Sequence, residues 1–188
     1  LAGAWATRAI APVSTVAERL EPPEVFEAFV AMRESIGLEI FPLDAGRDVF
    51  RDLVRAARTG GRLIPLLSDR DLTARGVEVE LCGHPARVAA GPAALAITTR
   101  CPLFAVTMRH ERLVGARRAA AGTRWGLVVE FTPVQVPEAP RAEQVRELTQ
   151  AWVDVLGADI AAHPTHWHML QRVFLADLDA PTTTEGAT

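Results

Sequence analysis

Two spacings of hydrophobic residues alternate along the first third of the chain. Short continuous or β-branched apolar runs are typical of strands, whereas apolar residues that recur every three or four positions are typical of amphipathic helices. In chain order, these patterns predict a helix over 1–11, a strand over 13–18, a helix over 22–35, a strand over 38–43, a helix over 44–59 and a strand over 63–67. Strands and helices in this alternation predict an α/β fold in which helices flank a central, mostly parallel β-sheet.

The pattern is less regular in the rest of the chain. It predicts strands over 77–81, 103–108, 113–116 and 127–131, and helices over 90–100 and 141–162. The first of these helices is expected to come after Gly83-His84-Pro85. The later strands are expected to be antiparallel in part. Residues 180–188 are polar and are expected to form a disordered tail.

The composition limits the classes of protein to consider. The chain has 188 residues, of which 49% are hydrophobic and 23% are charged. It can therefore build a core, and disorder is excluded as its main state. No run approaches the roughly 18 apolar residues that span a bilayer. Cys82 and Cys101 are too few for a disulfide framework or a zinc site of four cysteines, and a reduced cytosolic setting is expected.

All twenty basic residues are arginine, although the net charge is −3. Five of them follow one helical stripe at steps of three and four, namely Arg47, Arg51, Arg55, Arg58 and Arg62. Either they pair with the neighbouring Asp44, Asp48 and Asp52, or they meet anionic lipid headgroups. A second segment, 100–124, has six arginines and one acid, Glu111, which favours a phosphate-bearing ligand or the membrane surface. A nucleic-acid partner is not expected, because the chain is acidic overall and this segment has few aromatic residues.

Three histidines near the carboxyl end, His163, His166 and His168, raise the alternative of a zinc hydrolase, because imidazoles at this density can meet one metal ion. No fourth ligand is obvious nearby, and Pro164 interrupts the helix that would align the rings. A structural segment is therefore the favoured interpretation, and its expected packing residues are Trp167, Met169 and Leu170. Metal analysis of the purified protein distinguishes the two.

Charged side chains follow the predicted buried strand directly, in the stretch Ser68–Asp71. Burying such groups is costly unless they are paired or functional. Glu18 ends another predicted strand, and Arg33 lies on the helix between them. Ligands of parallel sheets bind at the carboxyl ends of the strands. The sequence therefore predicts an orienting site that includes Glu18, Arg33 and Asp69, with structural salt bridges as the alternative.

Six short segments, taken in order and spacing, resemble one known family. They are Phe29–Arg33, Leu63–Leu72, Gly83–Arg87, Gly91–Leu95, Cys101–Val106 and His163–Gln171. Together they resemble the bacterial acyltransferases of the lysophospholipid and lipid A type, over nearly the whole chain, and most of all the actinobacterial branch that acylates phosphatidylinositol mannosides. The resemblance implies that residues 1–179 are the C-terminal major part of one acyltransferase domain.

The resemblance also implies a reaction. Members of the family transfer a fatty acyl group from acyl-CoA, a co-substrate rather than a cofactor, to a hydroxyl group. For this chain the implied acceptor is a mannosylated phosphatidylinositol, in glycolipid biosynthesis. The implied location is peripheral, on the cytoplasmic face of the plasma membrane. A non-catalytic lipid- or CoA-binding module is the alternative from a different class.

The family signature is a histidine followed five positions later by an aspartate, with the histidine as the base. None of the five histidines in this chain has an aspartate at that spacing. The resemblance therefore implies that the signature lies immediately before Leu1, and that the chain by itself lacks its base and is inactive.

The remaining site residues are assigned by position in the resemblance. Asp69 is the catalytic residue, expected to orient the missing imidazole, although the family more commonly has Glu there. Glu18, Arg33 and Arg70 are the substrate-binding residues, and no metal ligand is assigned. Arg33 is expected to hold a phosphate or sugar oxygen, or the CoA diphosphate, through its bidentate guanidinium.

Overall fold

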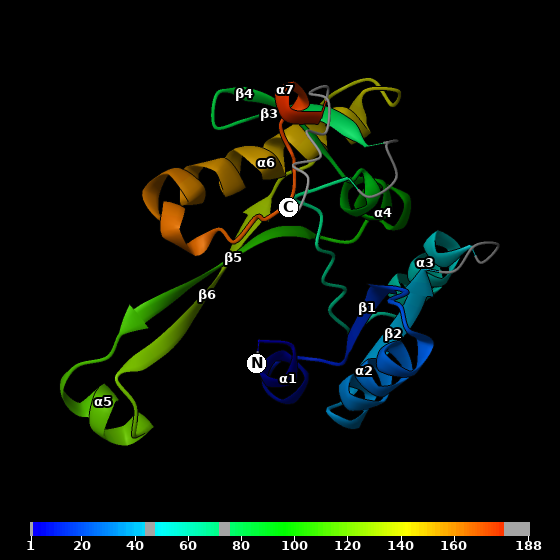
Figure 1. Cartoon of the computed structure of the whole chain (residues 1–188). Coiled ribbons are helices and arrows are strands. Elements are labelled where there is room, and N and C mark those ends of the chain that lie inside the picture. The colour runs from blue at the N-terminus through cyan, green and yellow to red at the C-terminus, as the bar shows by residue number, and fades with distance from the viewer. Residues whose placement is uncertain (1, 44–47, 72–75, 179–188) are drawn as a thin grey trace, which may run out of the picture. The chain divides into compact units, whose positions relative to one another are not determined.

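The computed structural model describes residues 2–43, 48–71 and 76–178 (Figure 1). The described residues form two compact units. The first unit lies within 1–67 and 91–102, and the second lies within 68–90 and 103–188. The expected tail over 180–188 lies outside the described residues, and the assignment of 1–179 to one domain stays a prediction. No helix within the described ranges is long and apolar enough to cross a membrane.

The first unit contains a parallel pair of strands that a helix connects. Its elements are α1 (Ala2–Ala9), β1 (Val13–Glu18), α2 (Pro23–Ser35), β2 (Leu38–Leu43), α3 (Val49–Thr59) and α4 (Gly91–Thr99). β1 and β2 pair from Val13 opposite Leu38 to Glu18 opposite Leu43. One cluster of buried residues joins Phe41, Leu53 and Leu95. Each of these elements matches a predicted one, except that residues 44–47 of the predicted third helix lie outside the described residues.

The predicted strand over 63–67 is wrong, and Pro65 supplies the physical reason. Leu63 makes both bonds of a parallel ladder with β1: its N–H donates to Pro12, and its carbonyl accepts from Ser14, each at 2.9 Å. Two residues later the next donor should be residue 65, but proline has no N–H. The Pro65 carbonyl instead accepts from the Thr15 hydroxyl at 2.7 Å. The ladder therefore ends after one bridge.

The second unit consists of two antiparallel pairs and a long helix. Its elements are β3 (Val77–Leu81), β4 (His84–Val88), β5 (Leu103–Arg112), α5 (Gly115–Ala121), β6 (Trp125–Val134), α6 (Gln144–Ala162), the 3-10 turn η1 (Pro164–His166) and α7 (Leu175–Leu178). The expected antiparallel pairing is confirmed. The structure is thus a mixed α/β fold with three two-stranded sheets, of which only β1–β2 is parallel, and no central parallel sheet is found in the ranges described.

One strand in this unit was not predicted, and one predicted strand is wrong. No element was predicted for β4, which pairs with β3 from Leu81 opposite His84 to Val77 opposite Val88. The expected strand over 113–116 instead leads into α5. The alanine-rich sequence of α5 favours a helix, and Gly122 ends it in a left-handed conformation at φ 64°.

Helix α6 covers β3 and fixes one of its edges. Leu148 and Val153 are completely buried on the inner face of α6. The Gln150 side chain lies along β3, where its amide accepts from the Glu80 N–H and donates to the Glu80 carbonyl, both at 2.9 Å. One side-chain amide therefore makes the two bonds that a neighbouring strand would make.

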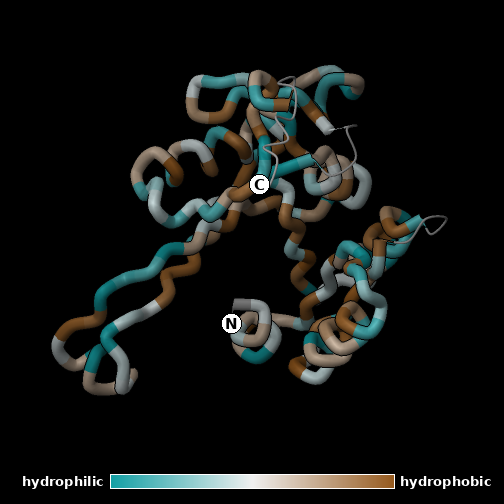
Figure 2. Tube along the Cα trace, viewed as in Figure 1, coloured by the Kyte–Doolittle hydropathy of each residue, from teal (hydrophilic) through white to brown (hydrophobic). Residues whose placement is uncertain are grey.

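The β5–β6 hairpin is the longest element of the second unit. It extends away from α6 and carries α5 at its far end (Figure 1). In Figure 2 the distal half of β5 is hydrophilic, whereas much of β6 is hydrophobic. Near its base, one face of the hairpin packs against α6, because Ala105, Thr107 and Val134 are buried there.

Candidate active site

The two charged residues after the 63–67 segment are held by a distant part of the chain. The indole N–H of Trp167 donates to Oδ2 of the half-buried Asp69 at 3.1 Å. The Arg70 guanidinium donates to the Gln171 side-chain oxygen. Both partners come from the segment 163–174. These bonds fix the orientation of the Asp69 carboxylate, as a positioning role requires.

The segment that supplies Trp167 is itself anchored on β4. The Arg87 N–H donates to the carbonyl of the buried Val173 at 3.1 Å. The Phe174 ring contacts two other rings edge to face: His84 with centroids 5.7 Å apart, and Trp167 with centroids 6.4 Å apart. The indole is thus positioned by packing, and a positioned donor loses less conformational entropy when it holds a carboxylate.

The sequence interpretation anticipated only part of this arrangement. Trp167 and Met169 are half-buried, as a structural segment requires. Leu170 is 96% exposed, so its predicted packing is wrong. The bond from Trp167 to Asp69 was missed, because nothing in the sequence links two residues 98 positions apart. The one available signal was that both lie in segments that carry the family resemblance.

Backbone contacts fix the rest of the 68–71 turn. The Asp71 carboxylate accepts from the Gly76 N–H at 2.7 Å, and the Ser68 carbonyl accepts from the Ala89 N–H at 3.2 Å. Gly76 lies so close to β4 that a Cβ there would be 2.3 Å from the Val88 carbonyl oxygen. This turn therefore depends on a glycine at position 76. Residues 72–75 lie outside the described residues.

Glu18 and Arg33 lie in the first unit, whereas Asp69 and Arg70 lie in the second. Glu18 is exposed at the carboxyl end of β1, as predicted. Asp69 was expected to follow a buried strand over 63–67, and this part of the prediction is wrong, because no strand precedes Asp69. The structure therefore brings Asp69 and Arg70 together in the second unit.

Arg33 is placed as a cation that is ready to bind an oxygen anion. Its guanidinium carbon lies 3.5 Å from the centre of the Phe29 ring, in a cation–π contact. Partial burial lowers the pKa of Arg33, but arginine stays charged in proteins. No hydrogen bond or ion pair to this guanidinium is found in the parts of the chain that the structure describes. The described residues thus leave its N–H fork without a hydrogen-bond acceptor.

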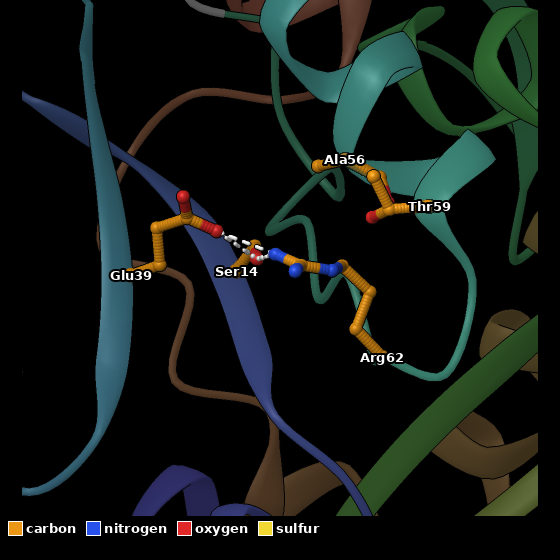
Figure 3. Close-up of polar contacts among 5 residues, drawn as sticks. All are labelled: Ser14, Glu39, Ala56, Thr59 and Arg62. Atoms are coloured by element: carbon orange, nitrogen blue, oxygen red, sulfur yellow. Dashed lines mark hydrogen bonds and ion pairs between the residues drawn. The ribbon is translucent and has the colours of Figure 1, made fainter.

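Ser14, Glu39 and Arg62 form a polar cluster that the sequence interpretation missed (Figure 3). The completely buried Ser14 hydroxyl donates to the Glu39 carboxylate at 2.6 Å. Arg62 lies 2.7 Å from the same hydroxyl and 2.6 Å from the same carboxylate. These bonds tie β1, β2 and the segment after α3 together. The cluster therefore has a structural role, because it connects three segments of the first unit.

The arginine stripe on α3 is partly neutralised by its neighbours. Arg55 pairs with Asp52 at 3.1 Å, and Arg62 turns inward to Glu39. Asp48 caps the helix by accepting from the Arg51 N–H at 3.1 Å. Pairing with a neighbouring aspartate, one of the two readings of this stripe, is thus confirmed for Arg55 among these residues. Arg47 and Asp44 lie outside the described residues.

The three carboxyl-terminal histidines do not converge on one point. The rings of His163 and His166 are stacked with centroids 6.0 Å apart, and His110 meets His166 edge to face at 6.0 Å. His168 faces the Thr165 carbonyl oxygen at 3.2 Å. Among the described residues, no group of three or more His, Cys, Asp or Glu side chains is arranged to hold a metal ion. The zinc-hydrolase alternative has no support from this geometry.

The described surface around Asp69 therefore offers one oriented carboxylate and a neighbouring guanidinium. A fixed carboxylate can hold an imidazole in one tautomer and stabilise its protonated form. A carboxylate bound by one indole N–H also keeps its second oxygen for such a partner. The arrangement suits a positioning role in acid–base chemistry.

Comparison with known proteins identifies relatives of this chain. The chain is 38% identical over 179 residues to a phosphatidylinositol mannoside acyltransferase of Mycolicibacterium smegmatis, covering 95% of this chain and 54% of that protein. It is 37% and 35% identical to two proteins of the same name from Mycobacterium tuberculosis strains, covering 95% of this chain and 52% of each relative. The chain thus spans about half the length of the curated relatives that it matches.

A family model agrees with these relatives over a similar extent. The model for the bacterial lipid A biosynthesis acyltransferases matches residues 1–176, which include every candidate site residue described above. The predicted resemblance is confirmed, and the chain belongs to the bacterial lipid A biosynthesis acyltransferase family.

Proposed function

We propose that the protein transfers a fatty acyl group from acyl-CoA to a hydroxyl of a mannosylated phosphatidylinositol. Family membership supports acyl transfer, and the names of the relatives support this acceptor. The observation that carries the proposal in the structure is the Asp69 carboxylate, which Trp167 holds in one orientation. Such a carboxylate is what a catalytic imidazole needs behind it.

The proposed chemistry is modest because a thioester is already activated. A histidine within hydrogen-bond reach of the acceptor hydroxyl removes its proton as the oxygen attacks the thioester carbonyl. The C–S bond then breaks, and CoA leaves as the thiol after its sulfur takes the proton from the imidazolium. General-base help of this kind contributes ~10²–10⁴-fold. Asp69 would fix the tautomer of that histidine and stabilise the imidazolium. None of the five histidines of this chain shows the spacing of the family signature, so we propose that the base lies outside residues 1–188.

The proposed substrate contacts are cationic and polar. Arg33, whose guanidinium has no hydrogen bond or ion pair in the described parts of the chain, would bind a phosphate or sugar oxygen through its fork. Arg70 and Glu18 are proposed to bind substrate as well, with Arg70 anchored through Gln171. Because the acceptor is a glycolipid, we propose that the protein works as a peripheral protein on the cytoplasmic face of the plasma membrane, without nucleic acid or cofactor.

A direct comparison of two proteins tests the proposal. The full-length protein, incubated with palmitoyl-CoA and a mannosylated phosphatidylinositol, is expected to give acylated product, detected by mass spectrometry. The 188-residue chain alone is expected to give none above the rate without enzyme. Turnover by the short chain would place the base inside residues 1–188. If the full-length protein is also inactive but binds either substrate, the non-catalytic lipid- or CoA-binding alternative is favoured.

Replacing Arg33 by Lys in the full-length protein is expected to raise KM for one of the two substrates about tenfold or more. A hydrogen bond to a charged group contributes about 1.5–3 kcal/mol, and an ammonium cannot reproduce the bidentate fork. Steady-state kinetics with each substrate varied in turn measure the effect. Arg58→Lys on α3 is the matched control and is expected to leave both KM values unchanged. Unchanged KM values for Arg33→Lys would reduce Arg33 to a structural role.

A further inference from the structure

We infer that the far end of the β5–β6 hairpin is the surface with which this protein contacts an anionic lipid bilayer. This hairpin tip comprises residues 112–125, including α5. The inference rests on the proposed function, which requires a lipid acceptor, and it identifies the part of the chain that meets the lipid.

One face of the hairpin is largely apolar and exposed within its unit, although its His110 ring meets the ring of His166. Residues paired across two strands share one face, and alternate pairs share the same face. In this register the pairs Phe104–Pro133, Val106–Phe131, Met108–Val129, His110–Leu127 and Arg112–Trp125 lie on one side. Six of their large hydrophobic side chains are between 38% and 53% exposed, namely Phe104, Val106, Met108, Trp125, Leu127 and Phe131. The opposite face is the one that packs against α6.

Unpaired positive charge is concentrated where this apolar face ends. Arg109 pairs with Glu130 at 2.8 Å, and Arg117 pairs with Glu111 at 2.9 Å. The three remaining arginines of the hairpin have no ion-pair partner among the described residues, and they are Arg112, Arg118 and Arg124. Both acids of the hairpin are thus consumed by pairing, and three positive charges remain at one end.

The geometry of the tip suits phosphate groups. Arg118 and Arg124 line one shallow surface hollow, together with Gly115, Ala119, Gly122 and Thr123. Trp125 follows directly at the start of β6, and Val114 beside α5 is 70% exposed. Positive charge for headgroups beside an aromatic ring and an exposed aliphatic side chain is the composition of an interfacial anchor.

A bilayer fits this surface better than other partners. A protein partner would require only the apolar face, and the charge excess at its end would be unexplained. A nucleic acid would require the charges without so much aliphatic surface. Anionic lipid accounts for both features, because headgroups pair with arginine while the acyl boundary receives apolar side chains.

Sedimentation of the full-length protein with vesicles tests the inference. Phosphatidylglycerol–phosphatidylcholine vesicles are expected to bind the protein at low salt, and pure phosphatidylcholine vesicles much less. Each basic residue near an anionic surface contributes a factor of about five, so Arg118→Glu combined with Arg124→Glu is expected to weaken binding about 25-fold or more. About 0.5 M salt, with roughly 4 Å screening, is expected to weaken binding by the wild type markedly.

A matched variant separates the tip from net charge. Arg51→Glu combined with Arg58→Glu makes the same charge change on α3, where these two arginines also have no ion-pair partner in the described ranges. This control is expected to weaken binding far less than the tip variant. Equal losses in the two variants, or wild-type binding by the tip variant, would overturn the inference. Thermal unfolding confirms that both variants fold.

Further measurements distinguish lipid from a second copy of the chain as the occupant of this face, and separate this inference from the proposed function. Brominated lipids are expected to quench Trp fluorescence in the wild type and to quench less in Trp125→Phe; equal quenching would remove Trp125 from the lipid contact. If the wild type is dimeric without lipid and Trp125→Phe is monomeric, a second copy covers this face, and the inference is wrong. In neutral detergent micelles the tip variant should acylate the acceptor like the wild type. Loss of acyl transfer by the wild type in micelles would count against the proposed function, whereas vesicle binding decides the present inference independently.

Discussion

Replacing Asp69 by Asn in the full-length protein is expected to lower kcat by about 100-fold or more while the protein folds normally. Asn keeps the shape of the side chain, and its oxygen still accepts from the Trp167 indole N–H. The negative charge that would stabilise an imidazolium is lost, and removing a charged orienting partner costs several kcal/mol in the transition state. Steady-state kinetics with palmitoyl-CoA and a mannosylated phosphatidylinositol measure kcat.

Two controls show whether charge or shape is responsible. Asp69→Glu restores the carboxylate that the family more commonly has at this position and is expected to retain most of kcat. Thermal unfolding of the Asn variant should match that of the wild type, because the Asn oxygen can accept the same hydrogen bond from Trp167 at this half-buried position. A well-folded Asn variant with the kcat of the wild type would remove Asp69 from the mechanism.

Gly76→Ala is expected to lower the free energy of unfolding by about 2–3 kcal/mol. The new Cβ would lie 2.3 Å from the Val88 carbonyl oxygen and 2.8 Å from the Asp71 side chain. A backbone oxygen on a paired strand cannot yield as the end of a flexible side chain can, so β3, β4 or the 68–71 turn must shift. Chemical denaturation followed by circular dichroism measures the change.

Gly157→Ala is the matched control for Gly76, and its expected effect has the opposite sign. Gly157 lies inside α6, and a Cβ there would meet Leu81 at 3.5 Å and Cys82 at 3.6 Å, which are ordinary contact distances. Replacing a mid-helix glycine by alanine stabilises by roughly 0.5–1 kcal/mol. A loss of stability in Gly157→Ala equal to that in Gly76→Ala would show that any added Cβ is harmful in this unit.

Local periodicity predicted the elements whose own residues determine their structure. Helix α2 begins at Pro23 and ends at Ser35, and α6 ends at Ala162, within one residue of the expected bounds. Up to α3, the described helices and strands of the first unit follow the predicted order.

The misassigned segments depend on interactions with other parts of the chain. The apolar run over 63–67 has strand composition, but the missing N–H of Pro65 matters only once β1 lies beside it. In β4, Pro85 resembles a turn residue, yet it pairs opposite Glu80 of β3. The local sequence does not show which strand a segment will pair with. These segments could therefore be interpreted only from their composition.

The candidate site was predicted residue by residue but not as an arrangement. The position of Asp69 and Arg70 followed from the order of the resembling segments. Their partners, Trp167 and Gln171, come from a segment about a hundred positions away, and that contact depends on how Val173 docks on β4. Side-chain packing of this kind is set by tertiary structure, which no local spacing encodes.

The amide of Gln150 has a consequence for the behaviour of this protein at high concentration. An uncovered strand edge is a template on which another chain can add a strand, and such addition leads to aggregation. By satisfying both backbone groups of Glu80, the amide removes the central attachment point from the edge of β3. Because Asp154 accepts from the same amide at 2.7 Å, a negative charge also lies beside that edge. One residue of a helix, rather than a further strand, thus occupies this part of the edge.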